Sequence, residues 1–323
     1  MSNDKMIRTL QVVTTRAGFF EQQVQVLEQN GISCTVVSVP KARGERSILD
    51  YLRFQSQVLR KTIQTDFDLV QANYGLTAPA VVAQPRRPIV VWLWGTELVG
   101  RYSRLNRACA VAADAVIVMS NRMADRFDRP CYVIRHGVDT ELFSPMAREK
   151  AQSAVGWDPD EKHVLFPWDP SRPIKNYPRA RAVVDAVDDH LDQEVTLQVV
   201  QNVPPREMPV YVNATDALIL TSEMEGSPNA VREALSCNVP VVSVDVGDVR
   251  ERISGVENCH VCTSDEELVS GLISVLRSGE RSNGRERIDE FSLERMATDL
   301  LTVYEDVLDD FQAPRATRRV PQP

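Results

Sequence analysis

The sequence predicts an α/β protein built from two doubly wound, Rossmann-like domains. Continuous Val, Ile and Leu runs, such as PIVVWLW at 88–94 and DALILTS at 216–222, alternate with helical segments. Such runs are typical of parallel strands that are buried on both faces of a sheet. The alternation ends near residue 138 and restarts at 163, and 323 residues are enough for two domains of ordinary size.

The first series of elements begins close to the start of the chain. A short loop with Gly18 precedes the helical stretch FFEQQVQVLEQN at 19–30, and Gly31 is placed to end that helix. The strands expected in this series span residues 8–15, 33–40, 67–73, 88–94, 114–120 and 131–138.

The second series repeats the pattern. Its expected strands span 163–169, 195–201, 216–222, 240–246 and 259–264, and its clearest helices span 177–189 and 229–237. Because Pro145 follows the last strand of the first series, we expect an N-terminal domain at 1–145 and a C-terminal domain at 146–290. The tail at 313–323 is expected to be disordered.

Composition and charge exclude several classes of protein. The net charge of −8 divides into +5 for residues 1–145 and −13 for the remainder, which indicates two domains that face different partners. The acidic balance and the lack of interleaved aromatic and basic residues argue against nucleic acid as a partner. No apolar run approaches the roughly 20 residues of a membrane span. The start, MSNDKMIRTLQVV, has no signal-peptide pattern, so we expect a cytoplasmic protein.

The cysteines do not predict a metal or redox site. Cys259 and Cys262 form one C-x-x-C pair, but a zinc site would need a second pair. A redox pair would open a helix, whereas this pair lies in an expected strand. Buried structural thiols are the better interpretation.

The stretch TSEMEGSPNAVREALSCNVPVVSVDVG, residues 221–247, carries the functional signal. Glu225 lies in the loop at the carboxyl end of a strand, where doubly wound sheets bind their ligands. Asn229 is a candidate N-cap for the next helix, which carries Glu233. Amide N–H groups of the loop and first turn can hold an anion. A carboxylate can accept two hydrogen bonds from a vicinal diol. We therefore expect one acid to bind a sugar ring and the other a ribose, with a diphosphate between them.

This stretch resembles the E-x7-E region of the retaining glycosyltransferases of family 4, which have the two-domain GT-B fold. The resemblance continues over roughly 8–310, through TRAGFFEQQVQVLEQNGISCTVV, WGTELVG, IRHGVDTELFSP and DPSRPIKNYP. FSLERMATDLLTVYEDVL is similar to that family's closing helix. The resemblance implies two domains that face a cleft and a helix over 291–312 that packs back on the first domain.

The resemblance also implies roles for individual residues. Glu225 would contact the transferred sugar, and Glu233 would bind the nucleotide ribose. Arg172 and Lys175 would neutralise the diphosphate leaving group, so no metal or other cofactor is implied. The remaining donor-binding residues implied are Gly18, Gly226, Ser227, Asn229 and Ala230.

The sequence departs from the family on the acceptor side. Trp94 stands where many members have a histidine, and Glu97 replaces their aspartate. The four histidines, His136, His163, His190 and His260, lie elsewhere in the sequence. Trp94 and Glu97 are the acceptor-side candidates, with Trp94 either packing in the domain or stacking on a sugar.

The segment KARGERSILDYLRFQSQVLRKTI at 41–63 has six basic and two acidic residues. Arg46, Arg53 and Arg60 recur every seven residues on one helix face, and Ile48, Leu52, Leu59 and Ile63 line another. Such a helix can lie on an anionic membrane or meet a lipid-linked phosphate. The alternative is a helix packed on the core with solvated arginines.

These observations predict a retaining transferase that moves a sugar from a nucleoside-diphosphate donor to a glycan or lipid-linked acceptor, in surface glycan, glycolipid or glycoprotein assembly. The protein would be cytoplasmic or peripheral on the cytoplasmic face of the membrane. Two alternatives remain: a nucleotide-sugar epimerase of the same architecture, and a non-catalytic sugar-nucleotide binding protein. A dehydrogenase is disfavoured because no G-x-G-x-x-G follows a strand.

Overall fold

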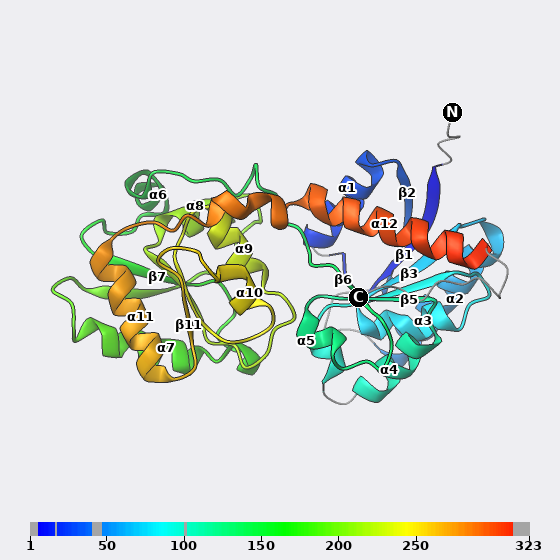
Figure 1. Ribbon diagram of the computed structural model, residues 1–323, viewed down its shortest axis with the longest axis horizontal. Coiled ribbons are helices and arrows are strands. Elements are labelled where there is room, and N and C mark those ends of the chain that lie inside the picture. Colours follow the sequence, from blue (N-terminus) through cyan, green and yellow to red (C-terminus); the bar gives the residue numbers. More distant parts are fainter. Residues whose placement is uncertain (1–5, 17, 41–46, 100–101, 313–323) are drawn as a thin grey trace. The chain divides into compact units, whose positions relative to one another are not determined.

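The computed structural model describes residues 6–16, 18–40, 47–99 and 102–312, apart from the side chain of Thr96. The chain divides into two compact units (Figure 1). Unit 1 comprises Met1–Gly137 and Leu293–Pro323, and unit 2 comprises Val138–Ser292. The tail at 313–323, for which disorder was expected, and residues 41–46 lie outside the described residues.

Unit 1 contains a parallel sheet with the order β2-β1-β3-β4-β5-β6 among its described residues. Val13, the last residue of β1, pairs with Ser38 of β2 and Asn73 of β3, so the carboxyl ends of these strands are level. The strands are β1 (Ile7–Val13), β2 (Ile32–Ser38), β3 (Leu69–Asn73), β4 (Ile89–Leu93), β5 (Ala115–Val118) and β6 (Tyr132–Val133).

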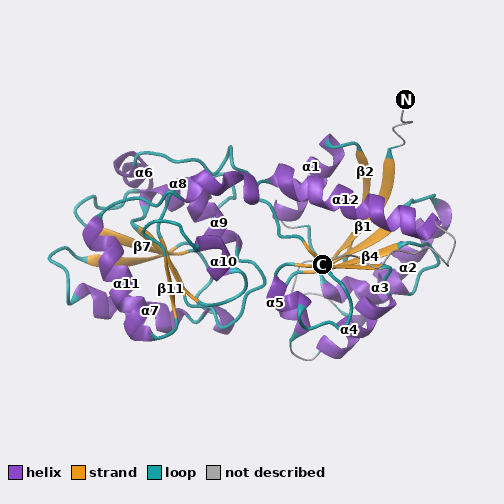
Figure 2. Ribbon diagram, in the orientation of Figure 1, coloured by secondary structure: helices purple, strands orange, loops and turns teal. Residues whose placement is uncertain are grey.

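Helices cover both faces of this sheet (Figure 2). α1 and α12 lie together on one side, and α2, α3 and α4 lie on the other. The helical segments of unit 1 are α1 (Gly18–Gln29), α2 (Ile48–Gln64), η1 (Gly75–Thr77), α3 (Ala78–Val82), η2 (Thr96–Leu98), α4 (Ser103–Ala112), α5 (Asn121–Ala124) and α12 (Leu293–Gln312).

The final helix, α12, completes unit 1, which confirms the prediction that it returns to the first domain. Its apolar side chains recur every three or four residues from Leu293 to Val307 and are buried against the sheet. Tyr304 is fully buried, and its hydroxyl donates to Gln71 Oε1 at 2.7 Å and accepts from Gln11 Nε2 at 3.2 Å. The helix is therefore fixed to β1 and β3 by polar contacts as well as by packing.

Unit 2 contains a parallel sheet with the order β11-β10-β9-β7-β8 in the described chain. Its strands are β7 (Lys162–Phe166), β8 (Val195–Val199), β9 (Ala217–Leu220), β10 (Val241–Val244) and β11 (His260–Cys262). Its helical segments are α6 (Arg148–Val155), η3 (Pro173–Lys175), α7 (Tyr177–Asp188), α8 (Met208–Ala214), α9 (Asn229–Ser236), α10 (Val249–Ile253), α11 (Asp265–Ser278) and η4 (Gly284–Glu290). The prediction of two doubly wound domains is thus confirmed.

One local expectation is corrected, and one open alternative is decided. Asn229 is the first helical residue of α9 and Pro228 is its N-cap, so Asn229 is not the cap residue. The apolar residues Ile48, Leu52, Leu59 and Ile63 of α2 do not pack on the core, because the buried residues of this helix are Asp50, Phe54, Val58 and Thr62. None of the helices in the described part of the chain has the length and hydropathy needed to cross a membrane.

The Tyr304→Phe variant should destabilise unit 1 by about 1–3 kcal/mol, because it leaves buried amide groups of Gln11 and Gln71 without their partner. Hydrogen exchange of peptides from β1 and β3, measured along a urea series, would detect this loss. Tyr132→Phe is the matched control, because that hydroxyl makes one long, exposed contact of 3.5 Å with Asp306. Equal protection in the two variants would contradict a stabilising role for the Tyr304 hydroxyl.

Candidate functional site

The candidate site lies at the carboxyl edge of the unit 2 sheet. β9 pairs in parallel with both β7 and β10, so the loops that follow these three strands open at one edge. These loops span residues 167–172, 221–228 and 245–248. Ligands of doubly wound sheets bind at this edge.

Lys175 and Glu225 meet here, although fifty positions separate them in the chain. Lys175 ends η3, and its Nζ donates to Glu225 Oε1 at 2.5 Å. The same nitrogen lies 4.4 Å from the ring centroid of Trp168, a cation–π distance. Two predicted catalytic residues therefore form one ion pair, against an aromatic ring that the sequence analysis did not single out.

Hydrogen bonds attach the segment 174–176, which contains Lys175, to the residues that follow β9. Thr221 Oγ1 donates to the carbonyl oxygens of Lys175 and Asn176, both at 3.1 Å. The amide of Glu223 donates to the Ile174 carbonyl at 3.0 Å. The loop after β7 and the loop after β9 are thus joined along their backbones, which fixes the position of the Lys175 ammonium.

The two cations of this loop differ in their surroundings. Lys175 is buried, and burial lowers the pKa of its ammonium, while the adjacent Glu225 carboxylate acts in the opposite direction. Arg172 is exposed at the N-cap of η3, and its guanidinium forms no ion pair with any residue that the structure describes. The site therefore offers one positioned cation and one that remains available to a ligand.

The start of α9 supplies amide donors. The N–H groups of Gly226, Ser227, Asn229 and Ala230 have no acceptor among the described residues. Unsatisfied N–H groups at a helix start attract anions, through hydrogen bonds and through the helix dipole. The side chains of Ser227 and Asn229 have another role, since both accept hydrogen bonds from the buried Arg232.

Glu233 lies in the second turn of α9 with its side chain half-buried. No described residue donates a hydrogen bond to its carboxylate. Burial raises the pKa of Glu233 to about 7, and the neighbouring Arg232 guanidinium opposes this rise. A ligand hydroxyl could supply the missing hydrogen bond, so the carboxylate is suited to bind a diol.

Gly247, in the loop after β10, lies directly against the loop that carries Glu225. Its φ is +57°, and a Cβ at this position would lie 2.7 Å from the Gly226 carbonyl oxygen. Sequence reasoning missed this contact. The available signal was the glycine's position after strand 240–246, the neighbour of the strand that precedes Glu225.

The acceptor-side candidates lie in unit 1. Trp94 is half-buried in a cluster with Phe19, Tyr74, Trp92 and His136. The His136 ring centroid lies 4.9 Å from that of Trp94. His136 is distant from Trp94 in the sequence, but the fold brings the two rings into contact.

Glu97 shapes the loops around Trp94. Its Oε1 accepts from the amides of Trp94 at 2.7 Å and Gly75 at 3.2 Å. Burial raises the pKa of this carboxyl group, while these amide hydrogen bonds oppose the rise.

Gly18 is exposed at the first position of α1. Contacts of Trp94, Glu97 and Gly18 with a substrate stay predictions.

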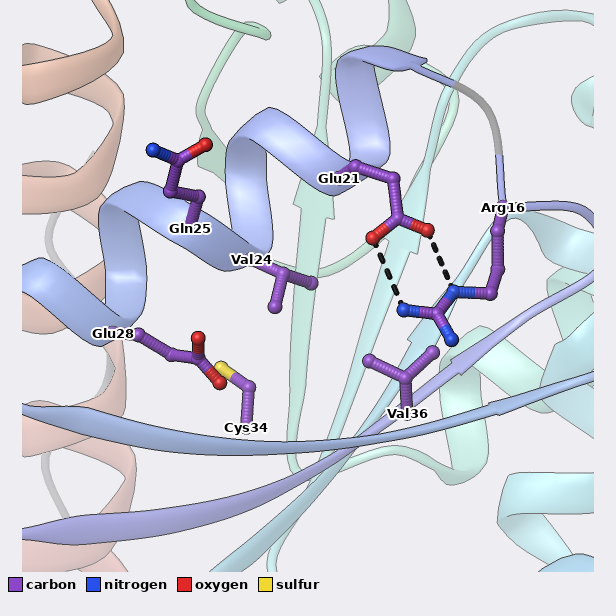
Figure 3. A pocket seen from close by; sticks show the side chains of 7 residues that line it. All are labelled: Arg16, Glu21, Val24, Gln25, Glu28, Cys34 and Val36. Carbon is purple, nitrogen blue, oxygen red and sulfur yellow. Dashed lines mark hydrogen bonds and ion pairs between the residues drawn. The ribbon is translucent and has the colours of Figure 1, made fainter.

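A pocket of about 380 Å³ lies in unit 1 between α1 and β2 (Figure 3). Arg16 at its rim is neutralised by Glu21 through contacts of 2.6 and 3.1 Å. Burial raises the pKa of the Cys34 thiol to about 11, so this group is protonated at neutral pH. The pocket therefore lacks the free cations that a diphosphate would need, and none of the predicted site residues lines it.

The cysteines and the acidic residues make no metal centre in the described chain, where no group of three or more His, Cys, Asp or Glu side chains could hold an ion. Burial raises the pKa of Cys259 to about 12 and that of Cys262 to about 11. Both thiols are free and protonated at neutral pH, as expected for structural cysteines.

Comparison with known proteins gives two family matches. Residues 9–142 match the profile of Glycosyltransferase Family 4, and residues 183–293 match Glycosyl transferases group 1. The first match lies almost entirely in unit 1 and the second almost entirely in unit 2.

Curated relatives are similar at low identity. A lipopolysaccharide core biosynthesis mannosyltransferase of Rhizobium meliloti is 26% identical over 232 residues, which cover 60% of this chain and 66% of the relative. A D-inositol 3-phosphate glycosyltransferase of Mycobacterium marinum is 27% identical over 224 residues, which cover 59% of this chain and 48% of the relative. The chain thus matches between about half and two thirds of the length of these relatives.

Solved structures share the fold. Anabaena HepE in complex with UDP and glucose superposes with a TM-score of 0.72 at 17% identity, covering 93% of this chain and 99% of HepE. WaaG, a glycosyltransferase involved in lipopolysaccharide biosynthesis, gives a TM-score of 0.68 at 13% identity, covering 92% and 99%.

The environment of Glu233 predicts a pH-dependent stability. Because its folded-state pKa of about 7 exceeds the ordinary value of 4.5, the fold favours the protonated acid. The contribution of Glu233 to stability should therefore be greatest below pH 4.5 and decline by up to about 3 kcal/mol as the pH rises to 7. Urea unfolding of the wild type and Glu233→Gln across this range measures the effect. The difference between the two proteins should change with pH, and a constant difference would contradict the raised pKa.

Proposed function

We propose that this chain, which belongs to the group 1 and family 4 glycosyltransferases of GT-B fold, transfers a sugar from a nucleoside-diphosphate donor to an acceptor hydroxyl. The observation that carries the proposal is the arrangement at one edge of the unit 2 sheet. There the Lys175–Glu225 pair, the unpaired N–H groups of Gly226, Ser227, Asn229 and Ala230 and the Glu233 carboxylate belong to the loops at this edge and to the helix that follows one of them. Cations and amides suit a diphosphate, and carboxylates suit sugar hydroxyls.

The chemistry follows from where charge develops. When the bond between the sugar carbon and the phosphate oxygen breaks, its electron pair stays on the diphosphate, which becomes more anionic. Lys175, Arg172 and the amides of 226–230 would stabilise this charge, a contribution that is typically large. The acceptor oxygen then bonds to the same carbon and gives its proton to the departing diphosphate oxygen. We propose retention of configuration, in which the acceptor attacks from the face that the diphosphate leaves.

Glu225 would orient the donor sugar while it holds the Lys175 ammonium, and Glu233 would accept from the ribose hydroxyls. In this scheme the charge of a metal ion is replaced by two side-chain cations and helix amides. Transfer is therefore expected to persist in EDTA.

The names of the relatives support a glycan or an inositol phosphate as the acceptor, because one is named for lipopolysaccharide core biosynthesis and another for D-inositol 3-phosphate. UDP bound to HepE supports a nucleoside-diphosphate donor. Neither the epimerase nor the non-catalytic alternative is favoured by these comparisons, and the donor base and sugar are left open.

The two carboxylates should bind different parts of the donor, Glu233 the nucleotide and Glu225 the sugar. Glu233→Gln should weaken binding of the bare nucleoside diphosphate by about 10- to 100-fold, since hydrogen bonds to a charged group contribute roughly 1.5–3 kcal/mol. Glu225→Gln should bind the bare nucleotide almost normally but lose transfer. Calorimetry would use whichever of UDP, GDP and ADP gives the largest rise in melting temperature.

Glu223→Gln is the matched control, because this exposed carboxylate lies in the same loop and its side chain has no partner among the described residues. It should resemble the wild type in both assays. Equal losses for Glu225→Gln and Glu233→Gln, or none for Glu233→Gln, would show that the roles are wrongly assigned. Absence of binding to all three nucleotides by the wild type would contradict the proposed function.

We also propose that α2 binds an anionic membrane surface. Ile48, Leu52, Leu59 and Ile63 are 82%, 58%, 39% and 64% exposed, and lie opposite the buried residues of the helix. The exposed Arg53 and Arg60 flank this apolar stripe, and Arg46 lies outside the described residues. Exposed apolar side chains beside cations fit the interface of an anionic bilayer. The core-packing alternative is not supported for these four apolar residues.

The double variant Arg53→Glu/Arg60→Glu should release the protein from vesicles of phosphatidylglycerol and phosphatidylcholine, at about 1 kcal/mol for each basic residue lost near the surface. Sedimentation with vesicles at two salt concentrations measures this. Arg181→Glu/Arg206→Glu makes the same charge change on exposed residues of unit 2 and should leave binding unchanged. Failure of the wild type to sediment, or equal release of both variants, would contradict binding through α2.

A further inference from the structure

Arg232 is a buried arginine inside the donor-binding helix α9, and the proposed transfer reaction gives it no role. It is 1% exposed, although arginine is seldom fully buried unless it is paired. Its Nη1 donates to Ser227 Oγ at 2.5 Å, and its Nη2 donates to Asn229 Oδ1. The guanidinium therefore folds back from the helix onto the loop that precedes it.

Ser227 also contacts the neighbouring loop, which follows β10. Its hydroxyl donates to Asp248 Oδ2 at 2.8 Å while it accepts from Arg232. Asp248 is 1% exposed, and Arg252 Nε donates to the same carboxylate oxygen at 3.0 Å. A single chain of hydrogen bonds thus runs from α9 through the β9 loop to the β10 loop. Gly247, beside Asp248, lets the two backbones approach closely.

These hydrogen bonds determine which donor groups of the loop before α9 remain available to a ligand. The Ser227 hydroxyl has one proton, and this proton is used on Asp248. The Asn229 side-chain oxygen is occupied by Arg232. The backbone N–H groups of Gly226, Ser227, Asn229 and Ala230 and the side-chain NH2 of Asn229 are consequently the donors that this loop can offer to an anion.

We propose that Arg232, Ser227 and Asp248 are positioning residues that hold the amides of 226–230 in the geometry required by the donor diphosphate. The inference rests on the proposed function and extends it, because it gives the Ser227 side chain an indirect role in place of direct phosphate contact. Buried, hydrogen-bonded charges of this kind restrict the conformation of the loop, because loss of one partner leaves the others desolvated and unpaired.

A double-mutant cycle tests the network on the full chain. Ser227→Ala and Asp248→Asn should each weaken binding of the nucleoside diphosphate at least about tenfold, the scale of one lost hydrogen bond to a charged group. The double variant should bind about as weakly as the weaker single variant, because both changes break the same link. Calorimetry would use the nucleotide of UDP, GDP and ADP that stabilises the wild type most.

Controls separate positioning from general stability. Ser236→Ala removes another buried hydroxyl from α9, one without a partner among the described residues, and should leave nucleotide affinity unchanged. Arg232→Lys keeps the charge but not the planar fork, so it should weaken binding as Ser227→Ala does. Affinities are measured well below each variant's melting temperature, so that a variant that is only less stable would still bind normally.

Three results would overturn the inference. Weaker binding for Ser227→Ala with normal binding for Asp248→Asn would show that the hydroxyl contacts the phosphate directly. Additive losses in the double variant would show that the two residues act separately. Normal affinity in both single variants, with clear binding by the wild type, would reject the network while the proposed function stands. Absence of wild-type binding would instead reject the proposed function.

Discussion

The parallel register of β7, β9 and β10 is the constraint on which the candidate site depends. Adjacent parallel strands end at the same edge, so loops that are far apart in the sequence open beside one another. Lys175 and Glu225 form a 2.5 Å ion pair for this reason, and Gly247 lies against Gly226 for the same reason. The sheet therefore assembles the site before any substrate is present.

Several ionisable side chains of the candidate site in unit 2 are buried or partly buried. Lys175, Glu233 and Arg232 are all removed from much of the solvent, which costs free energy unless partners compensate. Lys175 has Glu225, and Arg232 has Ser227 and Asn229, but Glu233 has no donor among the described residues. A half-buried acid without a hydrogen-bond donor, on the helix whose first N–H groups are also unpaired, is consistent with the proposed ligand.

Much of the fold and of the candidate site could be predicted from the sequence. The other features could not be predicted, for physical reasons. Apolar runs predict the two sheets, and the Glu225 and Glu233 spacing predicts the loop and helix. Trp168 and Asp248 could not be assigned because their roles depend on contacts across strands. The exposed face of α2 was ambiguous because Phe54 and Val58 on one side and Leu52 and Leu59 on the other have the same helical period. Periodicity identifies a face but does not decide which of two apolar faces is buried.

The most direct test of the central claim is a crystal structure of the chain with the nucleoside diphosphate that stabilises it most. The account predicts the β-phosphate within hydrogen-bond distance of the amides of 226–230 and of Lys175 Nζ, with ribose hydroxyls on the Glu233 carboxylate. A nucleotide bound at another place, such as the pocket between α1 and β2, or phosphates turned away from these amides, would contradict it.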